Sequence, residues 1–411
     1  MPVNVYALLT IPILTLVLAE FIYCSIKKNG MYTFQDSISS LGTAILNQCT
    51  NVVVALMFFP TYSWINEQFA FTQPEATWYN FALLFLGVDF LFYWFHRAGH
   101  SINILWAAHM PHHSTEELNY AVALRASFTQ RAASFFFYWP MALFFPAQWV
   151  LPMVAFHLIL QLIPHTRIVP KLPIWIESWL NTPSHHRVHH ACNKQYRNKN
   201  FGGFIIVWDK IFGSWVEEEE APYFGVTNPV RSWDPVVINV QWWGYLWRDM
   251  LATKSWWDKI RLWFMPIGWR PADLPPRDVY LRPDGTAETI EKFKSLELPG
   301  ARPSIVLGLL SAFPLMVSVT HHESPLSPVE RSFVAVVLWM AATSWAAMLE
   351  SKSWAKSFEI LRSMISALII VPLAFQHFES WVGIFYAFIY LAQAAWAISK
   401  FGIQNNNTSY A

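Results

Sequence analysis

Long apolar stretches separated by short polar segments occupy both ends of this 411-residue chain. About 20 apolar residues in a helix cross a bilayer, because the hydrocarbon core is about 30 Å thick. The pattern predicts three spanning or deeply inserted helices near the N-terminus, at Val3–Ile26, Leu41–Ile65 and Trp78–Phe95. Lys27 and Lys28 follow the first stretch rather than precede it, so we expect a retained helix and not a cleaved signal peptide.

A fourth apolar stretch, Ala132–Ile163, is too long for a single crossing. Pro140, Pro146 and Pro152 interrupt it, and proline breaks or kinks a helix, so we expect a hairpin of two helices. Four shorter or kinked apolar runs follow near the C-terminus, at Ser304–Thr320, Phe333–Met348, Ile365–Gln376 and Trp381–Ile398. The pattern predicts an all-α fold, a polytopic integral membrane helical bundle.

A polar, mixed region separates the hairpin from the last four apolar runs. The predicted organisation is N-terminal transmembrane helices in 1–75, a catalytic domain in 76–270, a linker in 271–300 and C-terminal transmembrane helices in 301–411. The proline-rich sequence RPADLPPR opens the linker. The sequence FGGFIIVWDKIFGSW, at 201–215, predicts a short strand or an interfacial helix.

Composition agrees with a membrane protein. Hydrophobic residues make up 54% of the chain and charged residues only 13%, about half the charged fraction of ordinary soluble domains. The 23 tryptophans and 32 phenylalanines suit membrane interfaces, where aromatic rings sit at headgroup level. A net charge of +1 gives no attractive field for nucleic acid, so we expect no such partner. The three cysteines are far apart and imply no disulfide framework.

Basic residues indicate the orientation, because short loops rich in Lys and Arg stay in the cytosol. The first loop has Lys27 and Lys28, whereas the second has Glu67 and Glu75 and no basic residue. Further basic residues fall on the side of the first loop: Arg97, Arg125, Arg131, Arg167, Lys171, Lys352, Lys356, Arg362 and Lys400. Arg331, on the other side, is an exception. We expect the N-terminus outside and the histidine-rich region on the cytosolic side.

Nine of the 14 histidines fall in two short windows. The first window holds His96, His100, His109, His112 and His113, and the second holds His185, His186, His189 and His190. The spacing HxxHH occurs in both windows, at 109–113 and at 186–190. Residues three and four apart share a helix face, so each trio is expected to direct its rings one way. Thr182 and Pro183 supply a helix start before the second trio.

Several neutral imidazoles directed at one place suit a transition metal, whereas protonated rings would repel one another beside a bilayer. Eight histidine ligands are too many for one tetrahedral ion and fit two metals. The chain lacks the paired ExxH motifs of carboxylate-rich diiron bundles and the HExxH of zinc proteases. The sequence therefore predicts a histidine-rich helical cap on the cytosolic side that holds a dimetal site.

The motifs HxxxH, HxxHH and HxxHH resemble the fatty acid hydroxylase / sterol desaturase superfamily of membrane non-haem diiron oxygenases. The resemblance extends to FYWFHRAGHSINILWAAHMPHHSTEELNYAVALR, NTPSHHRVHHACN and IIVWDKIFGSW, and covers most of Phe81–Arg270. It implies two irons, O2 as oxidant, a membrane lipid as the hydroxylated substrate, and an unidentified electron donor. Zinc is an expected substitute for iron after overexpression, because all-imidazole sites accept it.

Similarity is greatest to members of the superfamily that cleave alkylglycerol ethers. They hydroxylate the carbon beside the ether oxygen, and the hemiacetal collapses to glycerol and a fatty aldehyde. Tetrahydrobiopterin supplies the electrons in those members, where a glutamate directly follows the second histidine. Ser101 occupies that position here, which counts against pterin dependence and ether specificity. The alternatives are a hydroxylase or desaturase of an ornithine lipid, sterol, ceramide or fatty acyl chain, or a non-catalytic metal-binding membrane protein.

Three residues outside the trios are further candidates. His165 matches a superfamily ligand between the second and third motifs, so the resemblance adds it to the metal ligands. His157, two turns earlier, is either another ligand or a partner of a backbone carbonyl inside the hairpin. Asp89 shares a helix face with His96, and we expect it to bond a ligand's second nitrogen or to serve helix packing.

The remaining polar residues have less definite roles. His185 is turned by about 100° from His186, so it is expected to support the ligands or to face solvent. Asn119, Arg125 and Asp209 match the superfamily's segments and are expected to shape the site. The histidines outside these regions are expected to be ordinary polar residues: His321, His322 and His377.

Overall fold

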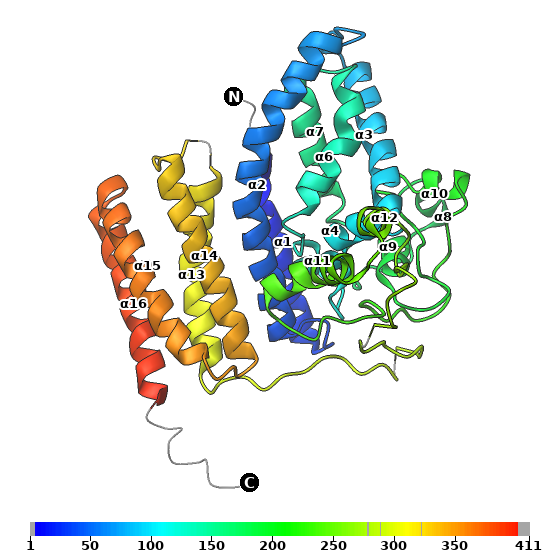
Figure 1. Ribbon diagram of the computed structural model, residues 1–411. Helices are drawn as coiled ribbons and strands as arrows, with labels where there is room; N and C mark the ends of the chain where they lie inside the picture. Colours follow the sequence, from blue (N-terminus) through cyan, green and yellow to red (C-terminus); the bar gives the residue numbers. More distant parts are fainter. Residues whose placement is uncertain (1–4, 278, 288, 322, 402–411) are drawn as a thin grey trace. The chain divides into compact units, whose positions relative to one another are not determined.

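The computed structural model describes residues 5–401 except 278, 288 and 322, and every regular element in that part is a helix (Figure 1). This confirms the predicted all-α class for the described residues. The segment 201–215 contains a helix, α10 (Val207–Ile211), and no strand. Isolated β-bridges join loop segments at Ile102–Pro266, Leu180–Ile205 and Ala191–Phe224.

Two compact units divide the chain. The first combines residues up to Ser37 with Val53–Arg231 and Ile238–Lys292, and the second combines Ile38–Val52, Ser232–Val237 and the residues from Phe293 onward. The helices before residue 270 are α1 (Val5–Lys27), α2 (Phe34–Phe69), α3 (Trp78–Gly99), α4 (Asn103–His113), α5 (Tyr120–Ala123), α6 (Gln130–Ala142), α7 (Ala147–Leu160), α8 (Ile174–Glu177), α9 (Pro183–His190), α10, α11 (Pro235–Ala252) and α12 (Trp256–Arg261).

The predicted hairpin in 132–163 is confirmed as α6 and α7, which pack beside α3 (Figure 1). The break falls at Pro146, which precedes α7, whereas Pro140 and Pro152 lie inside the helices. Asn66 of α2 donates from Nδ2 to the carbonyls of Ala142 and Phe145, at 2.7 and 3.2 Å, and so satisfies the helix end at the turn. With 13 and 14 residues, each helix is about 20 Å long, shorter than a bilayer core.

Helix α3 connects the apolar part of the first unit to the histidines. It extends beyond the predicted end at Phe95 to Gly99 and carries His96, with His100 as its C-terminal cap. The chain turns sharply into α4, where Ile102 pairs with Pro266 and the Asn103 side chain donates to the carbonyl of Leu262 at 2.9 Å. These contacts fix the start of the helix that carries the next three histidines.

The second unit contains α13 (Ala301–Thr320), α14 (Pro328–Leu349), α15 (Ala355–His377) and α16 (Ser380–Phe401). The predicted run Ile365–Gln376 was too short, because α15 begins ten residues earlier at Ala355. Glu359 and Arg362 interrupt the apolar pattern there, but they pair inside the bundle at 2.6 Å and are almost fully buried. Paired charges can be buried in a helix that the apolar pattern alone would end.

Five helices among the described residues are long and apolar enough to cross a membrane, namely α3 and α13 to α16. Helix α1 overlaps the first predicted span, and α2 contains the second but is longer at both ends, from Phe34 to Phe69. Exposed aromatic and aliphatic side chains cover the outer faces of α3, as at Trp78, Tyr79 and Leu83. The chain is a multi-pass integral membrane protein.

Candidate metal centre

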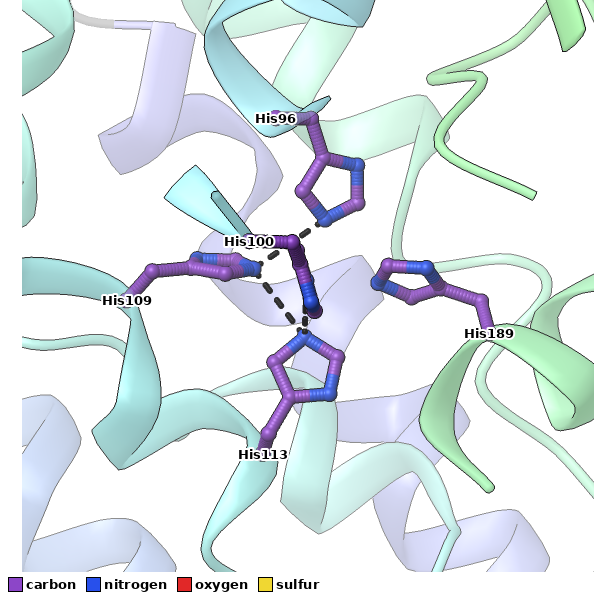
Figure 2. Close-up of side chains that lie close together, drawn as sticks. All are labelled: His96, His100, His109, His113 and His189. Atoms are coloured by element: carbon purple, nitrogen blue, oxygen red, sulfur yellow. Dashed lines mark hydrogen bonds between the residues drawn. The ribbon is translucent and has the colours of Figure 1, made fainter. Parts of the chain in front are cut away.

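Nine histidines form two buried groups whose ring nitrogens approach one another closely. The ligand atoms within each group lie within 4.8 Å of each other. The five-histidine group consists of His96, His100, His109, His113 and His189, and the four-histidine group of His112, His165, His186 and His190. Figure 2 shows the rings of the five-histidine group arranged around a common centre. The structure therefore brings together all eight histidines of the three motifs, together with His165.

Each trio is divided between the two groups. In α4, His109 and His113 belong to the five-histidine group and His112 belongs to the other. In α9, His189 belongs to the five-histidine group, whereas His186 and His190 belong to the four-histidine group. The prediction that each trio directs all its rings to one place was therefore wrong in detail. The reason is the helical rotation: His112 and His113 are adjacent and diverge by about 100°.

Backbone carbonyls orient four of the rings through Nδ1. His96 donates to the carbonyl of Phe201 at 2.8 Å, and His189 donates to that of Lys199 at 3.0 Å. His112 and His165 do the same with other carbonyls, those of Arg125 and Gln161, at 3.0 and 2.7 Å. A carbonyl only accepts, so the proton is on Nδ1 and Nε2 is left with a bare lone pair.

The bare nitrogens face one another. Nε2 of His165 lies 3.3 Å from Nε2 of His112 and 2.9 Å from that of His186. Since Nδ1 of both His112 and His165 holds the ring proton, the first contact places two lone pairs face to face. Nε2 of His189 and of His190 are buried with no hydrogen-bond partner among the described residues. A buried unpaired nitrogen is costly, and a cation between the rings removes the cost.

The spacing also fits a metal ion. Two imidazole nitrogens bound side by side at about 2.1 Å from one ion stand about 3.0 to 3.4 Å apart. In the five-histidine group, the Nε2 atoms of His96 and His113 lie 3.1 and 3.0 Å from that of His109, and those of His100 and His113 lie 3.1 Å apart. These distances suit ligation of a shared ion.

Burial keeps the rings neutral. It lowers the pKa of His112 to about 4 and that of His189 to about 3. Burial, followed by repulsion from neighbouring histidines, also lowers the pKa of these other rings outside the membrane spans: His100, His109, His113, His165, His186 and His190. Neutral imidazole is the form that binds metals, so the electrostatics favour ligation at neutral pH.

His157 is not brought to either group. Its Nε2 bonds Oδ1 of Asp89 at 2.6 Å, and its Nδ1 accepts from the side chain of Gln161 at 2.8 Å, so both ring nitrogens are occupied. Asp89 therefore bonds His157 and not a member of the groups. Its Oδ1 also accepts from the backbone N–H of Phe204, and its Oδ2 from the indole of Trp208, both at 2.8 Å.

His185 lies outside both groups and supports the start of α9. It is buried, with Nε2 3.2 Å from Glu177 and Nδ1 3.4 Å from the backbone nitrogen of Thr182. Thr182 precedes α9 and Pro183 is its first residue, which confirms the predicted helix start. Glu177 also accepts from the Thr182 and Ser184 hydroxyls at 2.8 and 2.7 Å. Glu177 could not be predicted from the sequence pattern, because it acts across a turn.

Asn119, Arg125 and Asp209, which were expected to shape the site, belong to neither histidine group. Asn119 caps α5 by accepting from Val122 N at 3.2 Å. Arg125, which ends that turn, orients His112 through its carbonyl and pairs with Asp36 at 3.2 Å. Asp209 binds the backbone of 201–202, the segment that orients His96.

Two features beside the five-histidine group were not anticipated from the sequence. Trp106 lies against the five-histidine group, 5.2 Å between ring centroids from His100. The carbonyls of the loop 199–204 form the second feature, since backbone atoms carry no sequence signal.

The histidines outside the two windows lie elsewhere. His377 bonds Glu330 at 3.0 Å in the second unit, and His321 accepts from Glu323 N. His322 lies outside the described residues.

Fold and site together define a helical membrane protein with two buried histidine groups suited to metal ions. A family model for fatty acid hydroxylases matches residues 81–214, a range that contains all nine histidines. The chain belongs to the fatty acid hydroxylase family. No solved structure matches it.

Curated alkylglycerol monooxygenases are similar to this chain over much of its length. The Homo sapiens protein is 32% identical over 80% of this chain and 74% of its own length. The Danio rerio protein is 30% identical over 86% of this chain and 79% of its own length. The Xenopus tropicalis protein is 35% identical, over 64% of this chain and 59% of its own length.

Proposed function

We propose that this chain is a membrane-bound diiron monooxygenase that uses O2 to hydroxylate a lipid, with the ether-linked carbon of an alkylglycerol as the reacting position. The observation that carries the proposal is the set of bare, converging Nε2 atoms, such as the 3.3 Å contact between His112 and His165. Family membership and the alkylglycerol monooxygenase relatives support the reaction class.

The nine histidines would hold two iron ions, one in each group, within the catalytic domain proposed for 76–270. When bound, the irons supply the activation of O2 for insertion into a C–H bond. One oxygen atom enters the lipid, and the other leaves as water with two electrons and two protons from an external donor. The protein holds the ligands neutral and oriented, and keeps bulk water from them, because most of the histidines are buried.

The lipid would reach the site from the bilayer. Helix α3 is a candidate span and carries His96 near its end, so an acyl chain beside that helix lies next to the five-histidine group. Charge bias supports a cytosolic location for both groups, with the N-terminus outside. The histidine-bearing segments would then form a cap on the cytosolic face of the membrane.

One residue of this chain bears on the source of electrons. Ser101, directly after His100, offers a hydroxyl that donates to the carbonyl of Arg97 at 2.7 Å, and it carries no negative charge. This difference counts against tetrahydrobiopterin as the electron donor of this chain. The difference also supports a second candidate, hydroxylation or desaturation of another lipid such as a sterol, ceramide, ornithine lipid or fatty acyl chain.

Lipid profiling together with metal analysis tests the proposal. Cells lacking the chain should accumulate alkylglycerol lipids, and restoring it should remove them with release of fatty aldehyde under O2. Gently purified protein should contain about two irons, partly replaced by zinc after overexpression. Adding tetrahydrobiopterin should not raise turnover.

The control is a strain expressing His186→Ala at the same level. Accumulation of a different lipid class would favour the second candidate. A protein with two metals and no O2 uptake with any lipid would indicate a non-catalytic metal protein. Less than one equivalent of transition metal would rule out the metal centre itself.

A further inference from the structure

The loop between α9 and α10 supplies carbonyls to the five-histidine group from two successive positions. Lys199 orients His189 of α9, and Phe201 orients His96 of α3, so one short segment fixes rings from two different helices. The backbone around Lys199 is unusual, because Asn198 and Asn200 both have positive φ, at 59° and 54°. Asparagine tolerates this left-handed conformation better than most residues, although it remains less favourable than for glycine.

A buried carboxylate holds the second half of this loop. Oδ1 of Asp209 accepts from the backbone N–H of Phe201 and Oδ2 from that of Gly202, both at 2.7 Å. Asp209 is fully buried. A Cβ on Gly202 would lie 3.0 Å from Oδ2 and 2.6 Å from the Ile205 carbonyl, so the backbone approaches the carboxylate too closely for a side chain.

Ser214 and Asn200 extend the support to Lys199. The Ser214 hydroxyl donates to Oδ1 of Asp209 at 2.7 Å, and the Ser214 carbonyl accepts from Asn200 N at 3.0 Å. The Asn200 side chain donates to the Val216 carbonyl and accepts from Val216 N, both at 2.8 Å. These contacts fix the peptide that presents the Lys199 carbonyl to His189.

Two rings of the four-histidine group are oriented from elsewhere. The Nδ1 atoms of His112 and His165 bond the carbonyls of Arg125 and Gln161, which lie outside the loop. Gln161 is in turn held through its side chain by His157, at 2.8 Å. The two groups therefore have different backbone supports.

We infer that Asp209 is a positioning residue for the five-histidine group, which acts by fixing the loop 199–202 whose carbonyls orient His96 and His189. The inference rests on the proposed metal centre. It assigns to Asp209 a selective effect on one of two metal positions. Substitution of a residue that orients a metal-bound histidine typically lowers metal affinity by about 10- to 100-fold.

The test is Asp209→Asn in the full chain, which preserves shape but directs an NH2 group at one of the two backbone N–H groups. In chelator competition with iron or cobalt, the affinity for one of the two metals should fall by about 10-fold or more, while the affinity for the other stays unchanged. In the cobalt-loaded protein, the absorption bands of one metal position should decrease selectively. Asp258→Asn is the matched control, because that buried carboxylate lies in the first turn of α12 and accepts a hydrogen bond from Arg261.

The outcomes separate this inference from the proposed function. Wild-type protein with less than one metal would refute the metal centre, whatever Asp209→Asn does. Two metals with unchanged chelator titration in Asp209→Asn would overturn the inference, as would an equal weakening of both. If Asp209→Asn does not fold, Ser214→Ala serves as the test, because it removes one hydrogen bond to Asp209. The affinity for the same metal should then fall severalfold, and an unchanged chelator titration would overturn the inference.

Discussion

Adjacent histidines in this chain serve different groups because successive residues on a helix are rotated by about 100°. His112 and His113 in α4 diverge in this way, and so do His189 and His190 in α9. Each of these helices therefore contributes two rings to one group and one ring to the other. The same rotation turns His185 away from His186, toward Glu177, where it has a bonded partner.

This difference predicts an order of effects among the histidines of α9. His186→Ala, His189→Ala and His190→Ala should each abolish O2-dependent lipid oxidation and lower bound metal, because each removes a converging Nε2. His185→Ala should retain the metal and part of the activity, since its ring bonds Thr182 and Glu177. All variants should be assayed for metal content and turnover in the same membranes.

His321→Ala is the control for this series, because its ring bonds Glu323 N in the second unit and should change neither quantity. Loss of metal in His185→Ala with retention in His186→Ala would show that the ligand assignment in α9 is incorrect. If no α9 variant changes activity, the histidine groups hold no catalytic metal.

At the scale of elements, a polar cluster ties together the four helices of the second unit. Arg362 of α15 donates to both oxygens of Glu359, at 2.7 and 2.6 Å, and to Gln393 of α16 at 2.7 Å. Ser344 of α14 donates to Glu359 at 2.6 Å, and Gln393 reaches the carbonyl of Ser304 in α13 at 3.2 Å. Helix α15 thus contributes two partners, and α13, α14 and α16 contribute one each, to a network that leaves Glu359 and Arg362 paired within the bundle.

Removing one partner of this ion pair should destabilise the protein more than removing both. Arg362→Met leaves the Glu359 carboxylate buried and unpaired, a change that costs about 3–5 kcal/mol in comparable sites. The double variant Glu359→Gln with Arg362→Met removes the uncompensated charge and should recover part of the loss. Thermal unfolding of the purified protein in detergent measures both effects.

Arg302→Met serves as the comparison, because Arg302 pairs with Glu297 at an exposed position, where ion pairs contribute about 0–1 kcal/mol. A double variant as unstable as Arg362→Met would mean that lost packing, and not the unpaired charge, determines the effect.

At the scale of the whole molecule, the distribution of charge along the chain sets the expected orientation in the membrane. Lys and Arg accumulate in the histidine-bearing segments of the first unit, whereas the loop between α2 and α3 contains none. Transferring basic loops across a membrane is unfavourable, so we expect the histidine groups on the cytosolic side.

Cysteine labelling in intact cells tests this orientation. A cysteine at Gln73, in the exposed α2–α3 loop, should react with a membrane-impermeant reagent added outside. A cysteine at exposed Lys194, after α9, should react only after permeabilisation. The native cysteines, Cys24, Cys49 and Cys192, are buried and provide a low background. The reverse pattern would place the histidine groups outside the cell.

The sequence by itself determined the helical class, the hairpin at 132–163, the helix start at Thr182 and the histidines that converge. These features are local, because apolar runs, prolines and caps act within a few residues of one another. A spacing of four residues also indicated which rings share a group, as for His109 with His113 and for His186 with His190. His165 was found through its resemblance to the family and not through spacing.

Only the tertiary structure decided how the nine histidines divide into five and four, and that His157 bonds Asp89 instead of joining either group. Spacing gives the direction of a ring around its own helix axis and contains no information on the distance to a ring on another helix. The same holds for the carbonyls of Lys199 and Phe201, which orient His189 and His96 through the backbone of a loop. Such contacts depend on how helices and loops pack, because the atoms that make them are common to every residue.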